Sequence, residues 1–220
     1  FHTMGANKFL FASEIKALLV DPDVPRELDP HGLDQLFTFW ATLAPRTVFR
    51  DIEELPPGHN LAVEQGGVRV WPYWHPEFGD PFEPADPRRA QQWAEQLMEL
   101  LLDATRLRLR ADVPVGAYLS GGLDSSVTTA LARQCTTGPL RTFSITFDDA
   151  EFDESIFQQK LVDSLATEHQ AVCCTHEAIA AALPEVVWHT ERPLIRTAPA
   201  PLYWLSKHVH DAGYKVVLTG

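Results

Sequence analysis

Strand-like and helix-like segments alternate along the second half of the 220-residue chain. Short apolar runs predict strands at 113–119, 141–147, 168–174 and 215–219. Amphipathic stretches between them predict helices at 125–135, 154–165, 177–189 and 201–212, the last of them ended by Gly213. Parallel strands need long crossover connections, which are usually helices, and these helices cover both faces of the sheet. The alternation therefore predicts an α/β fold built on a doubly wound parallel sheet.

The first part of the chain, residues 1–75, has a different pattern and predicts a small antiparallel unit. KFLFAS predicts a strand and SEIKALL a short helix. Asp29-Pro30 predicts a helix start, because aspartate caps helices and proline suits the first helical position. HNLAVEQGGVRVWPYW predicts a β-hairpin with Gly66-Gly67 at its turn.

A proline-rich segment, HPEFGDPFEPADP, follows this unit and predicts a linker over residues 76–87. Asp86-Pro87 then repeats the helix-start signal. Beyond it, apolar side chains recur at three- and four-residue steps, which predicts one buried stripe on a helix. The stripe comprises Trp93, Leu97, Leu100, Ala104 and Leu107.

Charge and composition exclude several classes of partner. The formal net charge is −12, which argues against nucleic acid, because phosphate backbones attract basic patches. No apolar run approaches the ~18–20 residues that a membrane span needs, so we expect no membrane partner either. The three cysteines, Cys135, Cys173 and Cys174, are odd in number and lack framework spacing. This pattern indicates a cytoplasmic location rather than a disulfide scaffold.

The turn after the first predicted strand carries the most specific signal in the chain. It reads SGGLDSS, from Ser120 to Ser126, and leads into a predicted helix. Gly121 and Gly122 allow backbone N–H groups to approach phosphate oxygens, the serines add hydroxyl donors, and the N-terminus of the helix attracts anions. Asp124 would repel a bare phosphate, so it predicts a Mg²⁺ ion that bridges carboxylate and phosphate.

Two other phosphate-binding loops are excluded by their spacing. A Walker loop needs GxxxxGK followed by Ser or Thr, and no lysine follows these glycines. A dinucleotide loop needs GxGxxG, which is also absent. The remaining alternative is a structural turn in which the glycines serve geometry alone.

SGGLDSS resembles the pyrophosphate-binding loop of the ATP pyrophosphatases, which split ATP between its α- and β-phosphates. More narrowly, nearly the whole chain resembles the glutamine-hydrolysing asparagine synthetases. FASEIKALL and LPPGHNLAV resemble the late part of that family's glutaminase domain. The motifs of its synthetase domain then follow in order: DVPVGAYLSGGLDSS, RTFSITFDDAEFDES, RTAPAPLYWLS and KVVLTG.

The resemblance implies an adenine nucleotide α-hydrolase-like sheet, preceded by the truncated end of an α+β Ntn-type glutaminase domain. Residues 1–75 would be the C-terminal part of the glutaminase domain and residues 76–87 the linker. Residues 88–220 would be the N-terminal part of the ATP-binding synthetase domain.

The resemblance also assigns ATP binding to the ends of three strands. Leu119 and Ile145 would flank the adenine and offer it backbone groups, and Thr219 and Gly220 would close the site. In a 3-2-1-4 strand order the first and fourth strands are neighbours, which supports the last assignment on physical grounds. The pyrophosphate cradle would be Ser120, Gly121, Gly122, Leu123, Asp124, Ser125 and Ser126, with Asp124 as the Mg²⁺ ligand.

The implied activity is that of an asparagine synthase, an ATP-dependent ligase that forms a C–N bond. Aspartate would attack the α-phosphate of ATP to give β-aspartyl-AMP and pyrophosphate, and ammonia from glutamine would displace AMP. Three alternatives stay open: an amidotransferase that adenylates another carboxylate, a β-lactam-synthetase-like cyclase, and a non-catalytic nucleotide-binding relative. The partners would be small-molecule substrates, and the oligomeric state, a homodimer included, is left open.

The chain departs from the family pattern at both ends. The family's nucleophile is an N-terminal cysteine, whereas this chain begins with Phe1. The family continues beyond its final Thr-Gly with an acidic loop that completes the metal site, and this chain stops at Gly220. We therefore expect an internal piece of a longer protein, with no catalytic residue of its own and little or no glutaminase or synthetase activity.

Several other residues have both a functional and a structural interpretation. A zinc site is one interpretation of His169, Cys173, Cys174 and His176. Adjacent cysteines in a strand point to opposite faces and rarely bind the same ion, so we prefer a buried strand end. The acidic run 148–154 is interpreted as a solvated loop in which Asp153 caps the next helix, with a role in shaping a substrate pocket as the alternative.

A charged pair of residues and three aromatic residues also have two interpretations each. Glu191 and Arg196 lie in a proline-rich loop expected near the site, where Arg196 would pair either with a substrate carboxylate or with a structural partner. We interpret Trp71, Tyr73 and Trp74 as packing residues at the domain junction rather than as a binding platform.

Overall fold

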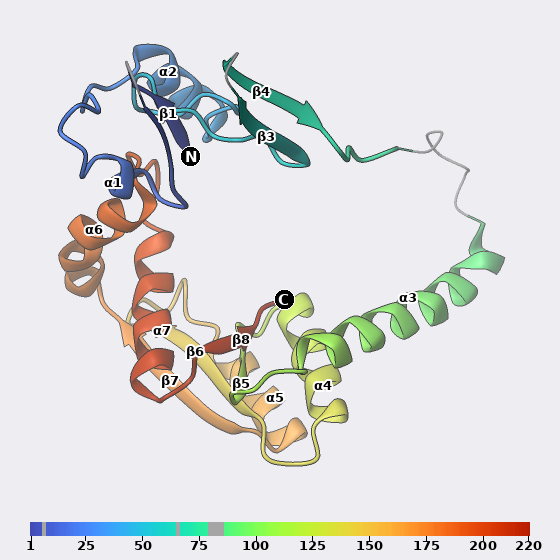
Figure 1. The fold of residues 1–220 in the computed structure, drawn as a ribbon. Helices are drawn as coiled ribbons and strands as arrows, with labels where there is room; N and C mark the ends of the chain where they lie inside the picture. The colour runs from blue at the N-terminus through green and yellow to red at the C-terminus, as the bar shows by residue number, and fades with distance from the viewer. Residues whose placement is uncertain (6–7, 65–66, 79–85) are drawn as a thin grey trace. The chain divides into compact units, whose positions relative to one another are not determined.

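The computed structural model describes residues 1–5, 8–64, 67–78 and 86–220 of the chain. The chain forms two compact units, which are described separately (Figure 1). Unit 1 comprises Phe1–Pro81 and Val187–Ile195, and unit 2 comprises Phe82–Val186 and Arg196–Gly220. The predicted linker over residues 76–87 lies mostly outside the described residues.

Unit 2 is built on four parallel strands in the order β7-β6-β5-β8. β5 pairs with β6 on one side, where Ala117 faces Thr142, and with β8 on the other. The observed order is the 3-2-1-4 order considered from the sequence, in which the order of the strands along the sheet reverses beside β5. The strands are β5 (Val115–Tyr118), β6 (Arg141–Phe147), β7 (Glu168–Cys174) and β8 (Val216–Leu218).

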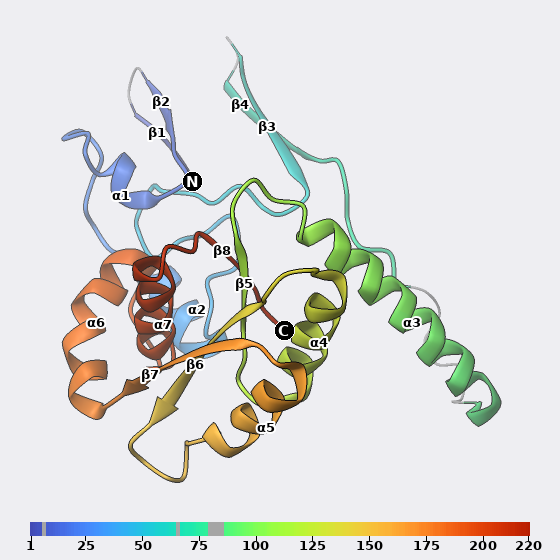
Figure 2. The same ribbon diagram turned by 90° about the horizontal axis from the view of Figure 1, so that it is seen from below.

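Helices cover both faces of this sheet (Figure 2). α4 (Leu123–Cys135) and α5 (Ser155–Leu165) lie on one face, and α7 (Pro199–Asp211) lies on the other. α6 (His176–Thr190) runs beside α7, where Trp204 Nε1 donates a hydrogen bond to the Ala178 carbonyl at 3.0 Å. The α/β fold with a doubly wound parallel sheet is thus confirmed.

Each face of the sheet buries its own apolar cluster. Ala117, Ala132, Leu140 and Leu218 pack under α4. Phe143 packs under α7 with Leu205 and Val209, and Tyr214 meets its ring edge-on at 5.4 Å between centroids. These clusters pack β5 and β6 against the helices on both faces of the sheet.

The long helix α3 (Pro87–Arg108) forms where the sequence predicts it, but its apolar stripe is not buried. The Asp86 carboxylate accepts a hydrogen bond from the Arg88 amide at 2.9 Å, as expected for a helix cap. Leu97 and Leu100, however, are 56% and 69% exposed, and the other stripe residues are exposed as well. The predicted burial of the stripe is wrong. Apolar periodicity shows that one face of the helix is suitable for packing, but it does not show that another element packs against that face. α3 contacts α4 near its C-terminal end, where Thr105 is buried.

Unit 1 consists of short elements around a small core. β1 (His2–Met4) pairs antiparallel with β2 (Phe9–Phe11), and α1 (Ile15–Leu18) follows. α2 (Pro30–Phe39) begins as predicted, with the Asp29 carboxylate accepting from the His31 amide at 3.0 Å. The core of this unit comprises Ile15, Leu18, Val24 and Ile52.

The predicted hairpin is also present in unit 1. β3 (His59–Glu64) pairs antiparallel with β4 (Gly67–Pro72), so that Glu64 faces Gly67. Gly67 is thus the first residue of β4, and the connecting residues 65–66 lie outside the described part of the chain. Tyr73 and Trp74, which we expected to be packed, are 68% and 60% exposed in unit 1.

Glu191 has a structural role in unit 1. Its carboxylate accepts hydrogen bonds from the backbone amides of Ile15 and Lys16 at 2.7 and 2.6 Å, and it forms an ion pair with Lys16 Nζ at 3.3 Å. Glu191 therefore binds the first turn of α1, a contact that the sequence interpretation did not anticipate.

The cysteine pair in β7 lies at a strand end, as expected. Cys174 is 1% exposed, whereas Cys173 is exposed on the opposite side of the strand. Within the described ranges, no three His, Cys, Asp or Glu side chains are grouped closely enough to hold a metal ion. Among the described helices, none is both long and apolar enough to cross a membrane.

We predict that Gly116→Ala destabilises unit 2. A Cβ atom at Gly116 would lie 2.9 Å from Cε2 of Phe143, which is fully buried. Relieving this overlap inside a packed core should lower the free energy of unfolding by about 1–3 kcal/mol, measured by urea unfolding followed with circular dichroism. As a control, Gly138→Ala meets no atom within 4 Å and should change stability by less than about 0.5 kcal/mol. Equal effects of the two variants would contradict this account of the core.

We also predict that the two β7 cysteines differ in reactivity. Burial raises the pKa of the Cys174 thiol, and the neighbouring Cys173 and Asp148 raise it further. Since the thiolate is the reactive form, a thiol reagent should modify Cys173 at least about tenfold faster than Cys174 under native conditions. Mass spectrometry of labelled peptides checks this, and Cys173→Ser should remove the faster modification in this strand. Similar rates at both positions would contradict the assignment of faces.

Candidate functional site

The glycine turn lies at the carboxyl end of β5 and leads directly into α4. Gly121 has φ of +88°, a conformation that side-chain-bearing residues rarely adopt. A Cβ atom at Gly121 would also lie 3.0 Å from Cβ of Phe157 in α5. Glycine is therefore required here both by backbone conformation and by the close approach of α5.

The serines of the turn hydrogen-bond to one another and to the turn's own backbone. Ser125 is 7% exposed, and its Oγ accepts from the Ser120 amide at 3.2 Å and donates to the Gly122 carbonyl at 3.2 Å. The Ser120 and Ser125 hydroxyls are 2.9 Å apart, and Ser126 Oγ also donates to the Gly122 carbonyl. These hydroxyls hold the shape of the turn, which differs from the direct ligand donors that the sequence suggested.

The N-terminus of α4 keeps its anion-attracting character. The first amides of any helix lack intrahelical acceptors. In α4 the N-cap residue is Gly122, which provides no side-chain acceptor for them. Gly220, the residue that ends the chain after β8, lies against this helix start. A Cβ atom at Gly220 would overlap the backbone of Asp124 and Ser125. The structure thus brings the predicted residues of β5, α4 and β8 together at one edge of the sheet, with Thr219 exposed beside them.

Asp124 is an exposed carboxylate in the first turn of α4. It belongs to no cluster of three potential metal ligands within the described residues. This setting does not form a protein cage for a metal. It does fit Mg²⁺, which is commonly held by one or two carboxylates together with substrate phosphates.

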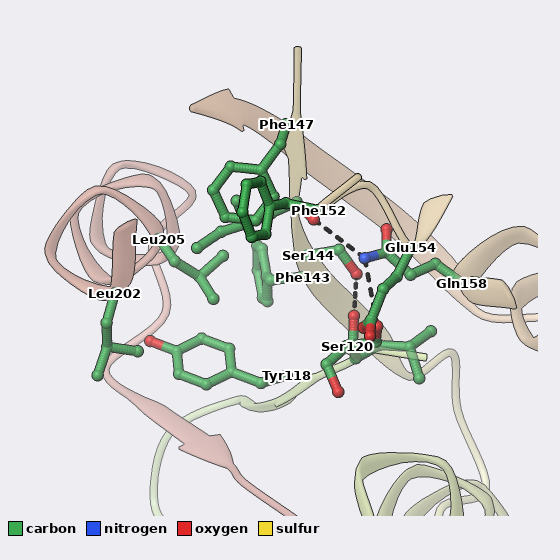
Figure 3. A pocket seen from close by; sticks show the side chains of 12 residues that line it. Tyr118, Ser120, Phe143, Ser144, Phe147, Phe152, Glu154, Gln158, Leu202 and Leu205 are labelled. Atoms are coloured by element: carbon green, nitrogen blue, oxygen red, sulfur yellow. Dashed lines mark hydrogen bonds between the residues drawn. The ribbon is translucent and has the colours of Figure 1, made fainter. Parts of the chain in front are cut away.

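A cavity of about 290 Å³ opens between the ends of β5 and β6 (Figure 3). Leu119, which is 1% exposed, and Ile145 both line it. Both backbone groups of Leu119 are already engaged: its amide donates to the Phe143 carbonyl at 2.9 Å, and its carbonyl accepts from Ser144 Oγ. The remaining lining residues are Tyr118, Ser120, Phe143, Ser144, Phe147, Phe152, Glu154, Gln158, Leu202 and Leu205.

A second cavity, of about 670 Å³, lies beyond the ends of β6 and β7 and shares Phe147, Phe152 and Glu154 with the first. Arg196 lines it, together with Asp148 and Asp149 of the acidic run. Residues of the acidic run thus line a cavity as well as forming a loop.

Asp153 of the same run binds the first residue of α5, although the N-cap residue is Glu154, which provides no side-chain cap. The Asp153 carboxylate accepts from Ser155 Oγ at 2.6 Å and from the Ser155 amide at 3.3 Å. The hydrogen bond from Ser155 lowers the pKa of the Asp153 carboxyl.

Two buried polar residues of the first cavity were missed by the sequence interpretation. Ser144 is a polar residue inside the apolar strand β6, and it is 1% exposed. Gln158 is 3% exposed on the face of α5 that carries Leu161 and Leu165. Helical spacing places Gln158 on the same inner face as these leucines. A polar residue at a position expected in the core was therefore the sequence signal that could have identified Gln158.

Known proteins resemble this chain over both of its parts. The model of the asparagine synthase family matches residues 96–220, and that of the glutamine amidotransferase domain matches residues 1–74. The glutamine-hydrolyzing asparagine synthetase 3 of Bacillus subtilis strain 168 is 31% identical over 224 residues, which cover 95% of this chain and 36% of that protein. The amidase chyE of Penicillium rubens is 31% identical over 235 residues, which cover 100% and 34%.

Among solved structures, the NH3-dependent NAD synthetase from Campylobacter jejuni gives a TM-score of 0.39 at 15% identity, covering 57% of this chain and 54% of that one. The chain spans about a third of the length of the curated relatives it matches. Since the asparagine synthase model covers more than half of the 220 residues, the chain belongs to the asparagine synthase family.

Proposed function

We propose that this chain provides the nucleotide site of a glutamine-dependent ligase that converts aspartate to asparagine. The side-chain carboxylate of aspartate attacks the α-phosphate of ATP, the bond to the pyrophosphate breaks, and β-aspartyl-AMP forms. Ammonia, released from glutamine, then attacks the activated carbonyl and displaces AMP. The observation that carries the proposal is the SGGLDSS turn between β5 and α4, with Gly220 of the neighbouring strand against it.

Each part of this site has a role in the proposal. The turn from Ser120 to Ser126 cradles the pyrophosphate with backbone amides and the N-terminus of α4, which stabilises the charge that develops on the leaving group. The cavity beside Leu119 and Ile145 takes the adenine ring, because its walls are mainly aromatic and aliphatic. Thr219 and Gly220 close the site from β8. Asp124 would hold Mg²⁺, which supplies positive charge next to the phosphates.

The proposal extends to the organisation and location of the protein. Residues 1–75 are the C-terminal part of a glutaminase domain, residues 76–87 a linker, and residues 88–220 the N-terminal part of the synthetase domain. The match of residues 1–74 to the glutamine amidotransferase domain supports the first assignment. The partners are small-molecule substrates, and the location is the cytoplasm.

The acceptor carboxylate is the part of the proposal with a specific rival. The similarity to the amidase chyE supports this rival function, in which an amidotransferase activates a carboxylate other than that of aspartate. In either case Arg196, in the second cavity with Asp148 and Asp149, would pair with a carboxylate of the acceptor.

One prediction of this proposal concerns nucleotide binding by the chain itself. Isothermal titration should show ATP binding that Mg²⁺ strengthens. Asp124→Asn should weaken binding about tenfold in Mg²⁺ and have little effect in EDTA, because it removes only the charge that holds the ion. The double variant Ser125→Ala/Ser126→Ala should weaken binding under both conditions, since these hydroxyls maintain the turn.

Asp103→Asn is the matched control for charge. Asp103 is exposed on α3, so this variant should bind ATP as the parent chain does. If neither Asp124→Asn nor the double variant changes the ATP affinity, the nucleotide binds at a site other than the glycine turn.

A second prediction concerns the reaction of the full-length gene product. Labelled pyrophosphate should exchange into ATP only when the acceptor is present, with aspartate the most effective of several carboxylates. Asp124→Ala should lower this exchange by about 100-fold or more, because it removes stabilisation of the leaving group, while glutamine hydrolysis continues. Exchange that depends on another carboxylate would favour the rival acceptor, and ATP binding without any exchange would indicate a non-catalytic relative.

A further inference from the structure

A buried glutamine bridges the two strand ends that line the first cavity. Gln158 Nε2 donates to the Ile145 carbonyl at 3.0 Å and to the Ser120 carbonyl at 3.4 Å (Figure 3). Ile145 belongs to β6, and Ser120 lies just beyond β5. One side-chain amide in α5 therefore joins two neighbouring strands where both approach the proposed nucleotide.

The partners of Gln158 fix the orientation of its amide. Backbone carbonyls only accept hydrogen bonds, so the amide nitrogen must face them and Oε1 must point away. Oε1 is buried and has no hydrogen-bond partner within the described structure. A buried acceptor without a donor is unfavourable, so an apolar residue of similar size would avoid this cost but could not form the bridge.

The bridge begins where the backbone pairing of the two strands ends. β5 and β6 pair through Ala117 with Thr142 and Tyr118 with Phe143. Beyond these pairs the cavity opens between the strands. Ser144 Oγ, which donates to the Leu119 carbonyl, and Gln158 continue the connection with side chains. We call these side-chain hydrogen bonds of Ser144 and Gln158 the clasp.

The same helix turn also touches the glycine turn. A Cβ atom at Gly121 would lie 3.4 Å from the backbone nitrogen of Gln158 and 3.0 Å from Phe157 Cβ. The clasp and this close packing therefore act on one short stretch, from Leu119 to Gly121.

We propose that Gln158 is a positioning residue of the nucleotide site. By holding the Ser120 and Ile145 carbonyls together, it sets the width of the cavity that takes the nucleobase and the place where the phosphate turn begins. The proposal rests on the function proposed above, and it adds a residue that lies outside the glycine turn and is separate from it in sequence.

The test is isothermal titration of the chain with MgATP, comparing two variants with a matched control. Gln158→Met keeps the length of the side chain and removes both donors, so it should weaken ATP binding about tenfold. Gln159→Met is the control, because Gln159 is exposed and its side chain donates to Asp163 in the same helix. It should bind ATP as the parent chain does.

Gln158→Glu adds a readout that a purely structural role would not give. Ionised, the new carboxylate faces two carbonyl oxygens and has no proton to donate. Protonated, its O–H group can restore one hydrogen bond, and burial favours this form by raising the pKa of the carboxyl. Its ATP affinity relative to the parent chain at the same pH should therefore recover severalfold between about pH 8 and about pH 5.5.

The outcomes separate this proposal from the proposed function. A parent chain that binds no ATP would overturn both. Equal ATP affinities of the parent chain and Gln158→Met would overturn the role of Gln158 alone. So would a Gln158→Glu variant whose ATP affinity, relative to the parent chain, does not recover at low pH. Circular dichroism at each pH establishes that the variants are folded, and if Gln158→Met does not fold, the pH dependence of Gln158→Glu decides.

Discussion

β5 is hydrogen-bonded along both of its edges, and the rest of the proposed site depends on this pairing. β6 brings Ile145 to one side of the strand end, and β8 brings Gly220 to the other. Because the pairing is parallel, all three strands end at the same edge of the sheet. α4 leaves from that edge, so its N-terminus lies where the three strand ends converge. A short strand of four residues thereby positions groups that lie about a hundred residues apart in sequence.

Much of this arrangement could be predicted from sequence, because it follows from local signals. Asp86 and Asp29 start their helices through caps within two residues, and the alternation of strands and helices leaves few topologies. The clasp could not be predicted in the same way, since its hydrogen bonds join residues from three elements. Ser125 shows a further limit: a serine in a turn can donate to a ligand or to nearby backbone, and only the structure distinguishes them.

The exposed stripe of α3 and the exposed rings of unit 1 show a different kind of limit. Helical periodicity describes the apolar face of one helix, whereas burial also requires a second element that packs against that face. Leu97 and Leu100 satisfy the pattern but remain mostly exposed, whereas Leu205 and Val209 of α7 satisfy it and lie against Phe143. The difference between the two helices is the presence of a sheet face, a property of the tertiary structure that neither helix encodes in its own sequence.

The hydrogen bonds between Glu191 and the first turn of α1 have a consequence for the order of folding. They span 175 and 176 residues, so unit 1 contains a segment that leaves the ribosome long after the rest of that unit. The amides of Ile15 and Lys16 must wait for their acceptor while most of unit 2 is being synthesised. Closing so long a loop also costs chain entropy, which grows with the logarithm of its length. Unit 1 thus reaches its final hydrogen bonding only after β5, β6 and β7 of unit 2 have been translated, although most of its own residues come first.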